Sequence, residues 1–244
     1  MNEDIYPERL RNIHLPPAVI YVKGKLPDID AEPAIAVIGT RKATPYGIKM
    51  GMRMGYEIAK CGATVISGLT MGIDSAAAEG ALLADGRVIG VLGLPHELDK
   101  SRFSQDVVMH GALVSEYAPG TKPYGSFFRA RNRITSGLSL GVAVIEAPLK
   151  SGTRLFVNEA ADQGKEIFAV PGNADQPNCE GTNLLIKEGE YITVGQPLAT
   201  VSQNKKLVLR AEVSEKHYKS LNLIRSANFK TPYDNKVYVL SELD

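Results

Sequence analysis

Short apolar runs recur through the first three quarters of the chain, and a helix-like segment follows nearly every one of them. Four to six consecutive apolar residues, rich in Val, Ile and Ala, are typical of strands that are buried on both faces. The runs occupy residues 34–39, 63–68, 87–93, 112–116, 141–147 and 166–172. Since such strands alternate with helices in parallel sheets, the pattern predicts an α/β fold, a doubly wound and mostly parallel sheet with helices on both faces.

The same pattern divides the chain into three parts. Residues 34–190 hold the strand–helix repeats and form the predicted α/β domain. Residues 1–33 are a Pro-rich N-terminal extension, in which 18–24 (AVIYVKG) is a candidate edge strand or flap. Residues 191–244 alternate apolar and polar positions, which predicts an atypical tail that is either β-rich or poorly ordered.

Composition and charge argue against several classes of protein. The 244 residues carry 28 basic and 27 acidic side chains, so the whole surface is not basic, although a local basic groove is compatible with this balance. No apolar run reaches the ~18–20 residues of a membrane span, and the N-terminus has no signal-peptide core. The two cysteines, Cys61 and Cys179, match no metal-ligand spacing and suggest no disulfide framework. We therefore expect a cytoplasmic protein with no membrane contact and no bound metal.

Gly, Ser, Thr and basic residues gather where the predicted strands end. Ligands of a doubly wound sheet bind at the carboxyl ends of its strands, and the free N–H groups of a helix start attract anions. Arg41, Lys42, Lys150 and Arg154 stand beside two of these loops. The loops therefore predict a phosphate-binding surface built from residues 39–47, 67–74, 131–137, 150–154 and 171–183.

Standard nucleotide motifs are missing from these loops. The chain contains no GxxxxGK[ST], and GTRKATPYG stands where a GxGxxG would follow the first strand. We therefore expect neither an ATPase nor a nicotinamide-dependent enzyme, and no cofactor. Asp74, at the start of a helix, is expected to cap that helix, whereas Glu116 and Glu146 end strands at the ligand-facing edge and are candidates for an acid or base.

Several of these segments, taken in order, resemble a known family. VIGTRKATPYG, VISGLTMGIDSAAAEGAL, VSEYAPGTKP, RARNRITSGLSLGVAVIEAPLKSG and QGKEIFAVPGNADQPNCEGTNLLIKEG resemble the DNA-processing protein A family, also called DprA or Smf. The resemblance covers roughly residues 5–190. It implies a Rossmann-like core that binds single-stranded DNA without strong sequence preference, forms a homodimer and assists loading of the RecA recombinase in natural transformation, without being an enzyme.

The resemblance also implies which residues contact DNA. Matched by position, the loop residues would hold backbone phosphates and the RNR segment would lie beside them. Because a single strand needs a cationic track and aromatic faces, we add Lys150 to the track and Phe127 and Phe128 for stacking, although at least one of the two rings is expected to pack in the core. The predicted site consists of Gly39, Thr40, Arg41, Lys42, Ser67, Gly68, Phe128, Arg131, Asn132, Arg133, Lys150, Ser151 and Gly152. We expect the segment 126–137 to enter extended and to become helical near Asn132, with Arg131 and Arg133 facing DNA and Arg129 solvated.

This chain departs from the family pattern at several positions. Ala78 stands where the family usually has His, and Phe128-Arg129 stands where it has Phe-Pro. Arg154 replaces an apolar residue, and the Tyr-Pro that usually follows VLGL is absent. In the tail, the segment EGEYITVGQPLATVSQNKKLVLRAEV looks like half of a lipoyl-like hairpin of the kind found in periplasmic efflux adaptors. These departures leave the fine geometry of the pocket and the role of the tail open.

The alternative is an enzyme or sensor that acts on a free nucleotide. Nucleoside-phosphate hydrolases of the Lonely Guy type share this general fold and carry PGGxGTxxE. The comparable segment here is KSGTRLFVNE, in which Glu159 lies six residues after Thr153 and so departs from that spacing. N-glycosidic hydrolysis needs a correctly placed acid or base, so the sequence favours the DNA-binding hypothesis.

Overall fold

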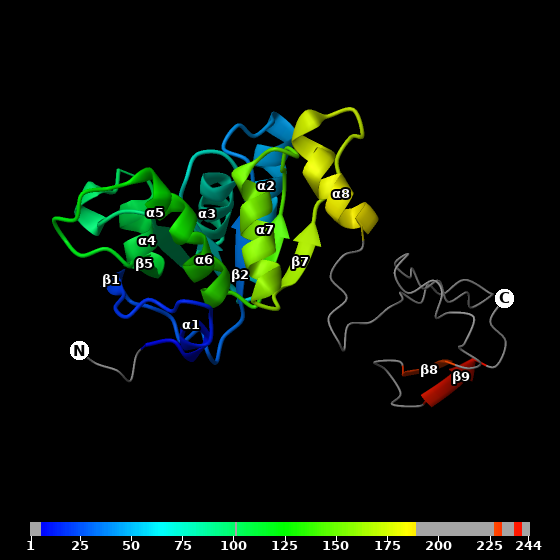
Figure 1. Ribbon diagram of the computed structural model, residues 1–244, viewed down its shortest axis with the longest axis horizontal. Coiled ribbons are helices and arrows are strands. Elements are labelled where there is room, and N and C mark those ends of the chain that lie inside the picture. The colour runs from blue at the N-terminus through cyan, green and yellow to red at the C-terminus, as the bar shows by residue number, and fades with distance from the viewer. Residues whose placement is uncertain (1–5, 101, 189–226, 231–236, 241–244) are drawn as a thin grey trace. The chain divides into compact units, whose positions relative to one another are not determined.

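A computed structural model describes residues 6–100, 102–188, 227–230 and 237–240 of the chain (Figure 1). The chain divides into two compact units, Met1–Lys187 and Glu188–Asp244. The first unit holds a seven-stranded sheet and eight α-helices within its described residues. Every predicted site residue belongs to this unit.

The elements of the first unit follow one another in the order that the apolar runs predict. Its strands are β1 (Tyr21–Gly24), β2 (Ala34–Ile38), β3 (Thr64–Ser67), β4 (Val88–Leu92), β5 (Ala112–Ser115), β6 (Gly141–Val144) and β7 (Glu166–Ala169). Its α-helices are α1 (Glu8–Arg11), α2 (Pro45–Lys60), α3 (Ile73–Leu83), α4 (Ser104–His110), α5 (Gly125–Ala130), α6 (Asn132–Leu138), α7 (Gly152–Asp162) and α8 (Glu180–Glu188), with short 3₁₀ turns at His96–Leu98 and Pro177–Cys179.

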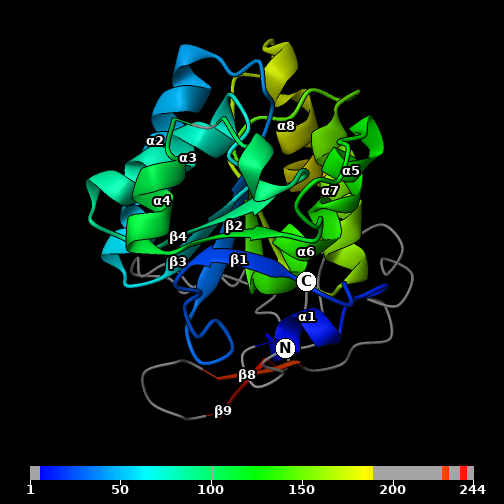
Figure 2. The ribbon, with the colours of Figure 1, turned by 90° about the vertical axis from the view of Figure 1, so that its left-hand side faces the viewer.

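The sheet is doubly wound. Its strand order is β1-β5-β4-β3-β2-β6-β7, and every neighbouring pair is parallel except β1 and β5. Figure 2 shows α2, α3 and α4 on one face and α5, α6 and α7 on the other. The predicted fold class is confirmed, and the candidate strand in 18–24 is indeed an edge strand. The chain reverses its direction of winding between β2 and β6, which makes the carboxyl ends of these two strands the place where such folds bind ligands.

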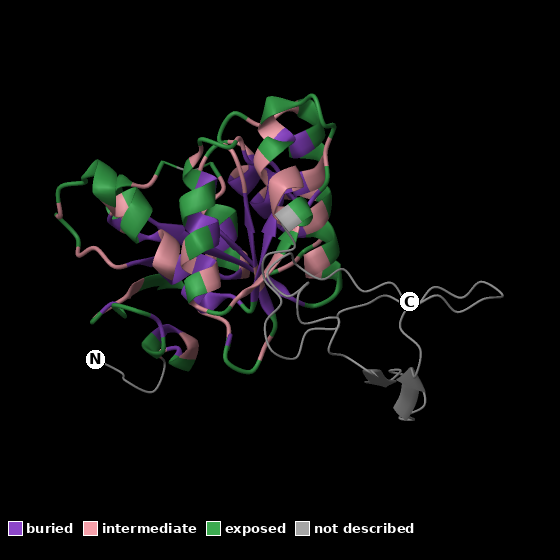
Figure 3. Cartoon of the chain, turned by 45° about the vertical axis from the view of Figure 1, so that its right-hand side comes forward, coloured by how far each residue is buried: buried purple, intermediate pink, exposed green. Residues whose placement is uncertain are grey.

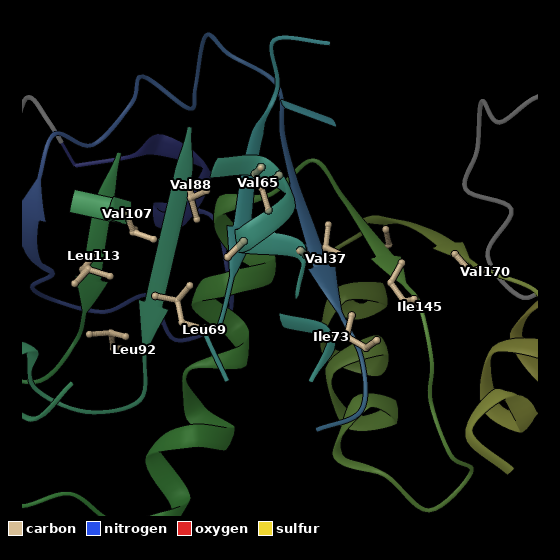
Figure 4. Close-up of a cluster of buried hydrophobic side chains, with 14 residues drawn as sticks. Val37, Val65, Leu69, Ile73, Val88, Leu92, Val107, Leu113, Ile145 and Val170 are labelled. Carbon is tan, nitrogen blue, oxygen red and sulfur yellow. The ribbon is translucent and has the colours of Figure 1, made fainter. Parts of the chain in front are cut away.

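The core lies on both faces of the central strands, as continuous apolar runs require. Figure 3 shows these strands as buried, and Figure 4 shows buried side chains from Leu113 to Ile145 spread across the sheet, together with Ile73 of α3 and Val107 of α4. The run at 166–172 differs from the others, because β7 is only partly buried and Phe168 is 55% exposed. Since β7 is the last strand in the order, it is an edge strand, and this is where the prediction of burial on both faces is wrong.

Helices α2 and α3 pack unusually closely because small residues line their contact. Gly47, Gly51 and Gly55 recur every fourth residue on one face of α2 and are buried. A Cβ on Gly55 would lie 2.0 Å from the carbonyl oxygen of Ala77, and one on Gly80 would lie 1.9 Å from that of Met52. The two backbones therefore touch at positions where only glycine fits.

Replacing Gly55 by alanine should lower the free energy of unfolding by about 1–3 kcal/mol, because the new methyl group must push the two helices apart. Urea unfolding followed by circular dichroism measures the loss. Gly125→Ala is the matched control: its Cβ meets nothing within 4 Å at the start of α5, so a change within about 0.5 kcal/mol is expected. Equal stability of both variants would contradict the close packing of α2 on α3.

In the second unit the structure describes one antiparallel hairpin, β8 (Ala227–Lys230) paired with β9 (Val237–Leu240). The predicted lipoyl-like segment lies outside the described residues, so its resemblance to efflux adaptors stays a prediction.

Candidate nucleic-acid interface

The loops that follow the parallel strands meet at one edge of the sheet, which we call the carboxyl edge. The arrowhead of β7 points to it in Figure 1. Residues 39–44 follow β2 and residues 145–151 follow β6, so the two loops flank the point where the winding reverses. The structure thus brings together the two loops in which the sequence predicts the strongest phosphate-binding chemistry.

Exposed cations stand on these two loops. Arg41 and Lys42 follow β2, whereas Lys150 and Arg154 lie at the start of α7, and all four are exposed. None of them forms an ion pair with any residue that the structure describes. Their charge is therefore available to an anion from solution.

The GTRK loop is held in place by its own backbone. The Thr40 amide donates to the Glu146 carbonyl oxygen at 2.8 Å, and the Ile73 amide donates to the Thr40 carbonyl oxygen at 3.3 Å. Gly72 has a φ of 88°, and a Cβ there would lie 2.3 Å from the Thr40 carbonyl oxygen. A glycine is required at this turn, because it has both a left-handed backbone and no room for a side chain.

Below the loops lies a buried polar cluster that joins the ends of β2, β3 and β4. Arg131 is 6% exposed and donates from Nη1 to the Val91 carbonyl oxygen at 2.7 Å. Its guanidinium lies against Gly68, where a Cβ would fall 1.9 Å from Nη1. The Asp74 carboxylate accepts from the Thr70 hydroxyl at 2.9 Å and from the backbone N–H groups of Gly39 and Gly68.

The sequence suggested that Asp74 caps its own helix, and the structure shows that it does not. Helix α3 begins after Gly72 with no side-chain cap, and the carboxylate turns instead to the loops after β2 and β3. Ser67 is also buried, and its hydroxyl donates to the Asp74 carbonyl oxygen at 2.8 Å. Ser67, Gly68 and Arg131 thus form a floor under the carboxyl edge and do not face solvent.

Arg131 and Asp74, the two buried charges below the loops, perturb each other's pKa. Burial raises the pKa of the Asp74 carboxyl, and the nearby Arg131 guanidinium opposes this rise. Burial lowers the pKa of Arg131. The charge of Asp74 opposes this lowering, and the like charge of Arg41 adds to it. The exposed Arg41 therefore lies within electrostatic reach of the buried Arg131.

The segment 125–138 is helical earlier than the sequence led us to expect. Helix α5 already spans Gly125–Ala130, and α6 starts at Asn132, with Arg131 at the junction. The expectation of an extended entry is wrong, because the Phe127 amide donates to the Tyr124 carbonyl oxygen at 3.0 Å and so starts the helix early. Arg131 turns inward from the junction, and Arg129 is left exposed.

Arg133 is tied into the fold by four acceptor atoms, one of which is the Ala130 carbonyl oxygen, 3.1 Å from Nη1. Its Nη1 donates to Glu116 Oε2 at 2.9 Å and its Nη2 to Glu116 Oε1 at 2.5 Å. Its Nε donates to the Leu15 carbonyl oxygen at 2.9 Å, which connects α6 to the N-terminal extension. This bidentate ion pair engages Glu116, one of the carboxylates that the sequence left as a candidate acid or base.

The two phenylalanines of the segment have different environments. The ring of Phe127 stacks on Tyr117 with centroids 3.8 Å apart and meets Tyr124 edge-on at 5.4 Å. Phe128 is 43% exposed, and its ring lies against Gly93 after β4. Phe127 therefore packs against neighbouring aromatic rings but is only half-buried, so neither ring lies in the core as was expected of at least one. Phe128 leaves part of its ring open at the carboxyl edge.

The start of α7 presents free donors. Ser151 precedes the helix without making a side-chain cap, and its buried Oγ has no hydrogen-bond partner within the described structure. Gly152 is exposed and a Cβ there would meet nothing within 4 Å. An anion can therefore approach the first backbone N–H groups of this eleven-residue helix closely.

A cavity of about 510 Å³ opens beside the point where the winding reverses. Its wall includes a buried carboxylate, Glu146, which accepts from the Thr44 hydroxyl and from the Thr44 amide at 2.9 Å. Tyr46 stands at the cavity with its hydroxyl donating to the Pro171 carbonyl oxygen at 2.9 Å. The lining consists of Thr44, Pro45, Tyr46, Glu146, Pro171, Gly172, Asn173, Gln176 and Cys179.

The sequence pointed to the loops that line this cavity, 39–47 and 171–183, but not to the contacts that join them. Sequence reasoning noted Glu146 without finding a partner, whereas the structure supplies Thr44 and places Asn178 Nδ2 3.5 Å from Glu146 Oε2 and 2.7 Å from the Lys42 carbonyl oxygen. Thr44 could have been found, because Thr before Pro is a common helix N-cap, and its hydroxyl does accept from the Gly47 amide at 3.1 Å. Asn178 joins the last loop to the GTRK loop across 136 residues, and nothing in the local sequence signals that contact.

The described residues contain no group of three or more His, Cys, Asp or Glu side chains that could hold a metal ion. Within the same part of the chain, no helix has both the length and the apolar character needed to cross a bilayer.

Known proteins with similar sequences are DNA-processing proteins. The chain is 38% identical over 188 residues to DNA processing protein DprA of Bacillus subtilis, covering 75% of this chain and 63% of that protein. It is 37% identical over 196 residues to protein Smf of Escherichia coli, covering 78% of this chain and 52% of that protein. The chain thus spans less than two thirds of the length of these two curated relatives.

Solved structures show the same likeness. DNA processing protein A from Streptococcus pneumoniae matches with a TM-score of 0.70 at 33% identity, over 77% of this chain and 67% of that one. The Helicobacter pylori protein, whose structure describes a single-stranded DNA binding mode, matches with a TM-score of 0.69 at 29% identity, over 78% of this chain and 88% of that one. The model of the DNA recombination-mediator protein A family matches residues 1–202, and the chain belongs to this family.

Proposed function

We propose that this protein binds single-stranded DNA across the carboxyl edge of its sheet. The observation that carries the proposal is the group of exposed cations without acidic partners, Arg41, Lys42, Lys150 and Arg154, on both sides of the point where the winding reverses. A single strand needs a cationic track for its phosphates and an aromatic face for its bases, and the exposed ring of Phe128 supplies the latter.

The predicted site residues take two roles in this proposal. Residues at the surface contact phosphate or base: Gly39, Thr40, Arg41, Lys42, Phe128, Lys150, Ser151 and Gly152. Residues below them brace the fold: Ser67, Gly68, Arg131 and Arg133. Asn132, at the start of α6, is half-buried, and its role in the site stays a prediction. The division differs from the sequence-based expectation, in which Arg131 and Arg133 were the main contacts and Arg129 was merely solvated.

The relatives support this function. The Helicobacter pylori protein A binds single-stranded DNA, and its likeness to this chain covers 78% of this chain and 88% of that one. The family also implies RecA loading, a homodimer and a cytoplasmic location, and these are part of the proposal. RecA loading and dimer formation would use surfaces other than the carboxyl edge.

The hydrolase alternative gains no support from the carboxylates at this edge. Asp74 is enclosed by Thr70 and two backbone N–H groups, Glu116 is paired with Arg133, and Glu146 is engaged by Thr44. A general acid or base must reach its substrate, and each of these groups is held by protein donors. We therefore propose a binding protein and not an enzyme.

Titrating the full chain with single- and double-stranded oligonucleotides at about 0.05 M and about 0.2 M salt tests the proposal. We expect tighter binding of the single strand. Its affinity should fall with a logarithmic salt slope of about −3, because four phosphate contacts each release about 0.7 counterion. Preference for duplex, or release of free base from nucleoside monophosphates, would contradict it.

A further inference from the structure

The outer face of α2 carries cations and aromatic rings in one row. Tyr46, Lys49, Arg53, Tyr56 and Lys60 are all exposed. With 3.6 residues per turn they fall within about 80° of the helix circumference, and they extend over about 21 Å of its axis. We call these five residues the α2 row.

The row points away from the body of the protein. Gly47, Gly51 and Gly55 lie on the opposite side of α2 and are buried, Gly47 against Glu146 and the other two against α3. Figure 2 shows α2 at the outside of its layer, beside α3. The close packing of the glycine face therefore fixes the direction of the row.

The charge of the row stands out in a chain that is nearly neutral. Lys49, Arg53 and Lys60 form no ion pair with any described residue, and Glu57 adds one exposed acid at this side of the helix. The Lys60 ammonium lies 5.6 Å from the centre of the Tyr56 ring. Cations that alternate with exposed aromatic rings are the combination that single-stranded nucleic acid requires.

The row also continues the carboxyl edge. Helix α2 begins directly after the GTRK loop, and its first exposed ring, Tyr46, is fixed at the cavity by the hydrogen bond from its hydroxyl to Pro171. A strand that leaves Arg41 and Lys42 along the outside of α2 meets Lys49, Arg53 and Tyr56 in turn. Between Lys42 and Lys49 the chain carries no acidic residue.

We propose that the α2 row is a second segment of the nucleic-acid-binding surface, along which a long single strand continues after it leaves the carboxyl edge. The inference rests on the proposed function, since it needs the strand to be bound at that edge first. It predicts that a short strand uses the carboxyl edge alone and that a long strand uses both surfaces.

Fluorescence can report on the two surfaces separately, because the chain contains no tryptophan. We expect Tyr56→Trp to be quenched by oligo-dT of about 20 nucleotides and not by one of about six, since stacking on the row requires the longer strand. Phe128→Trp should be quenched by both. Met109→Trp, at an 82% exposed position on α4, is the control and should respond to neither.

Removing charge from the row gives a second measurement. Lys49→Gln with Arg53→Gln should weaken binding of the long strand about 25-fold at about 0.1 M salt and leave the short strand unchanged, because two phosphate contacts are lost. Lys25→Gln with Lys187→Gln removes the same charge from exposed positions off α2 and should change neither.

The outcomes separate this inference from the proposed function. If the Phe128 reporter responds to the long strand and the Tyr56 reporter and the row variant do not, the strand bypasses α2 and the inference is wrong while the function stands. If the row variant changes only the sedimentation behaviour of the protein, the row contacts another copy of the chain, which also overturns the inference. If no reporter responds and no oligonucleotide binds, both fail together.

Discussion

Replacing Arg131 by methionine is expected to lower the free energy of unfolding by about 3 kcal/mol at neutral pH. The buried guanidinium donates to Val91, lies against Gly68 and offsets the charge of the buried Asp74. Methionine fills part of the volume but leaves Asp74 without its nearby cation. Urea unfolding of the full chain, followed by circular dichroism, measures the loss.

The pH dependence of this loss distinguishes an electrostatic role from simple packing. Burial raises the pKa of Asp74 in the folded protein, so the ionised carboxyl costs stability as the pH rises above its unfolded value of 3.8. Arg131 opposes that rise, so its removal enlarges the cost and extends it to higher pH. The destabilisation should therefore be smaller at acidic pH, where a larger fraction of Asp74 is protonated, than at about pH 8.

A second substitution provides the control. Adding Asp74→Asn to Arg131→Met removes the buried charge, so the double variant should be more stable at neutral pH than Arg131→Met alone and should lose the difference between the two pH values. An equal loss at both pH values would mean that Arg131 stabilises the fold through its hydrogen bond and packing alone.

The fold could be predicted because its signal is local. Each apolar run from β2 to β6 is long enough to identify a strand buried on both faces, and each is followed, after a loop, by a segment that is helical in the structure. The edge strand β7 was misjudged because a residue such as Phe168 is apolar whether or not a neighbour covers it. Position within the strand order decides burial there, and that is not encoded in the run itself.

The sequence could place the candidate loops at one edge of the sheet but could not sort their residues into exposed and buried ones. The rule that ligands bind at the carboxyl ends of strands points to the loops with Arg41 and Lys150, which the structure brings to the same edge. It does not distinguish Arg131, which is 6% exposed, from Arg129, which is exposed. That difference arises at the junction of α5 and α6, where the chain turns one arginine towards Gly68 and Val91, residues more than 35 positions away.

Removing the exposed cations of the carboxyl edge should weaken single-stranded DNA binding far more than removing any buried one. The triple variant Arg41→Ala, Lys42→Ala and Lys150→Ala loses three phosphate contacts. At about 0.1 M salt its affinity for oligo-dT should fall about 100-fold, and its logarithmic salt slope should flatten by about 2, since each contact accounts for about 0.7. Titrations at several salt concentrations measure both quantities.

The reason for expecting little structural damage is that these three side chains make no ion pair with described residues and stand at exposed positions. Surface substitutions of this kind change the free energy of unfolding by about 0.5 kcal/mol or less. Lys23→Ala, Lys25→Ala and Lys187→Ala together remove the same charge from exposed positions on other elements and serve as the control for a general loss of positive charge. If the control variant loses as much affinity as the edge variant, DNA responds to the net charge of the protein, and the carboxyl edge is not its binding site.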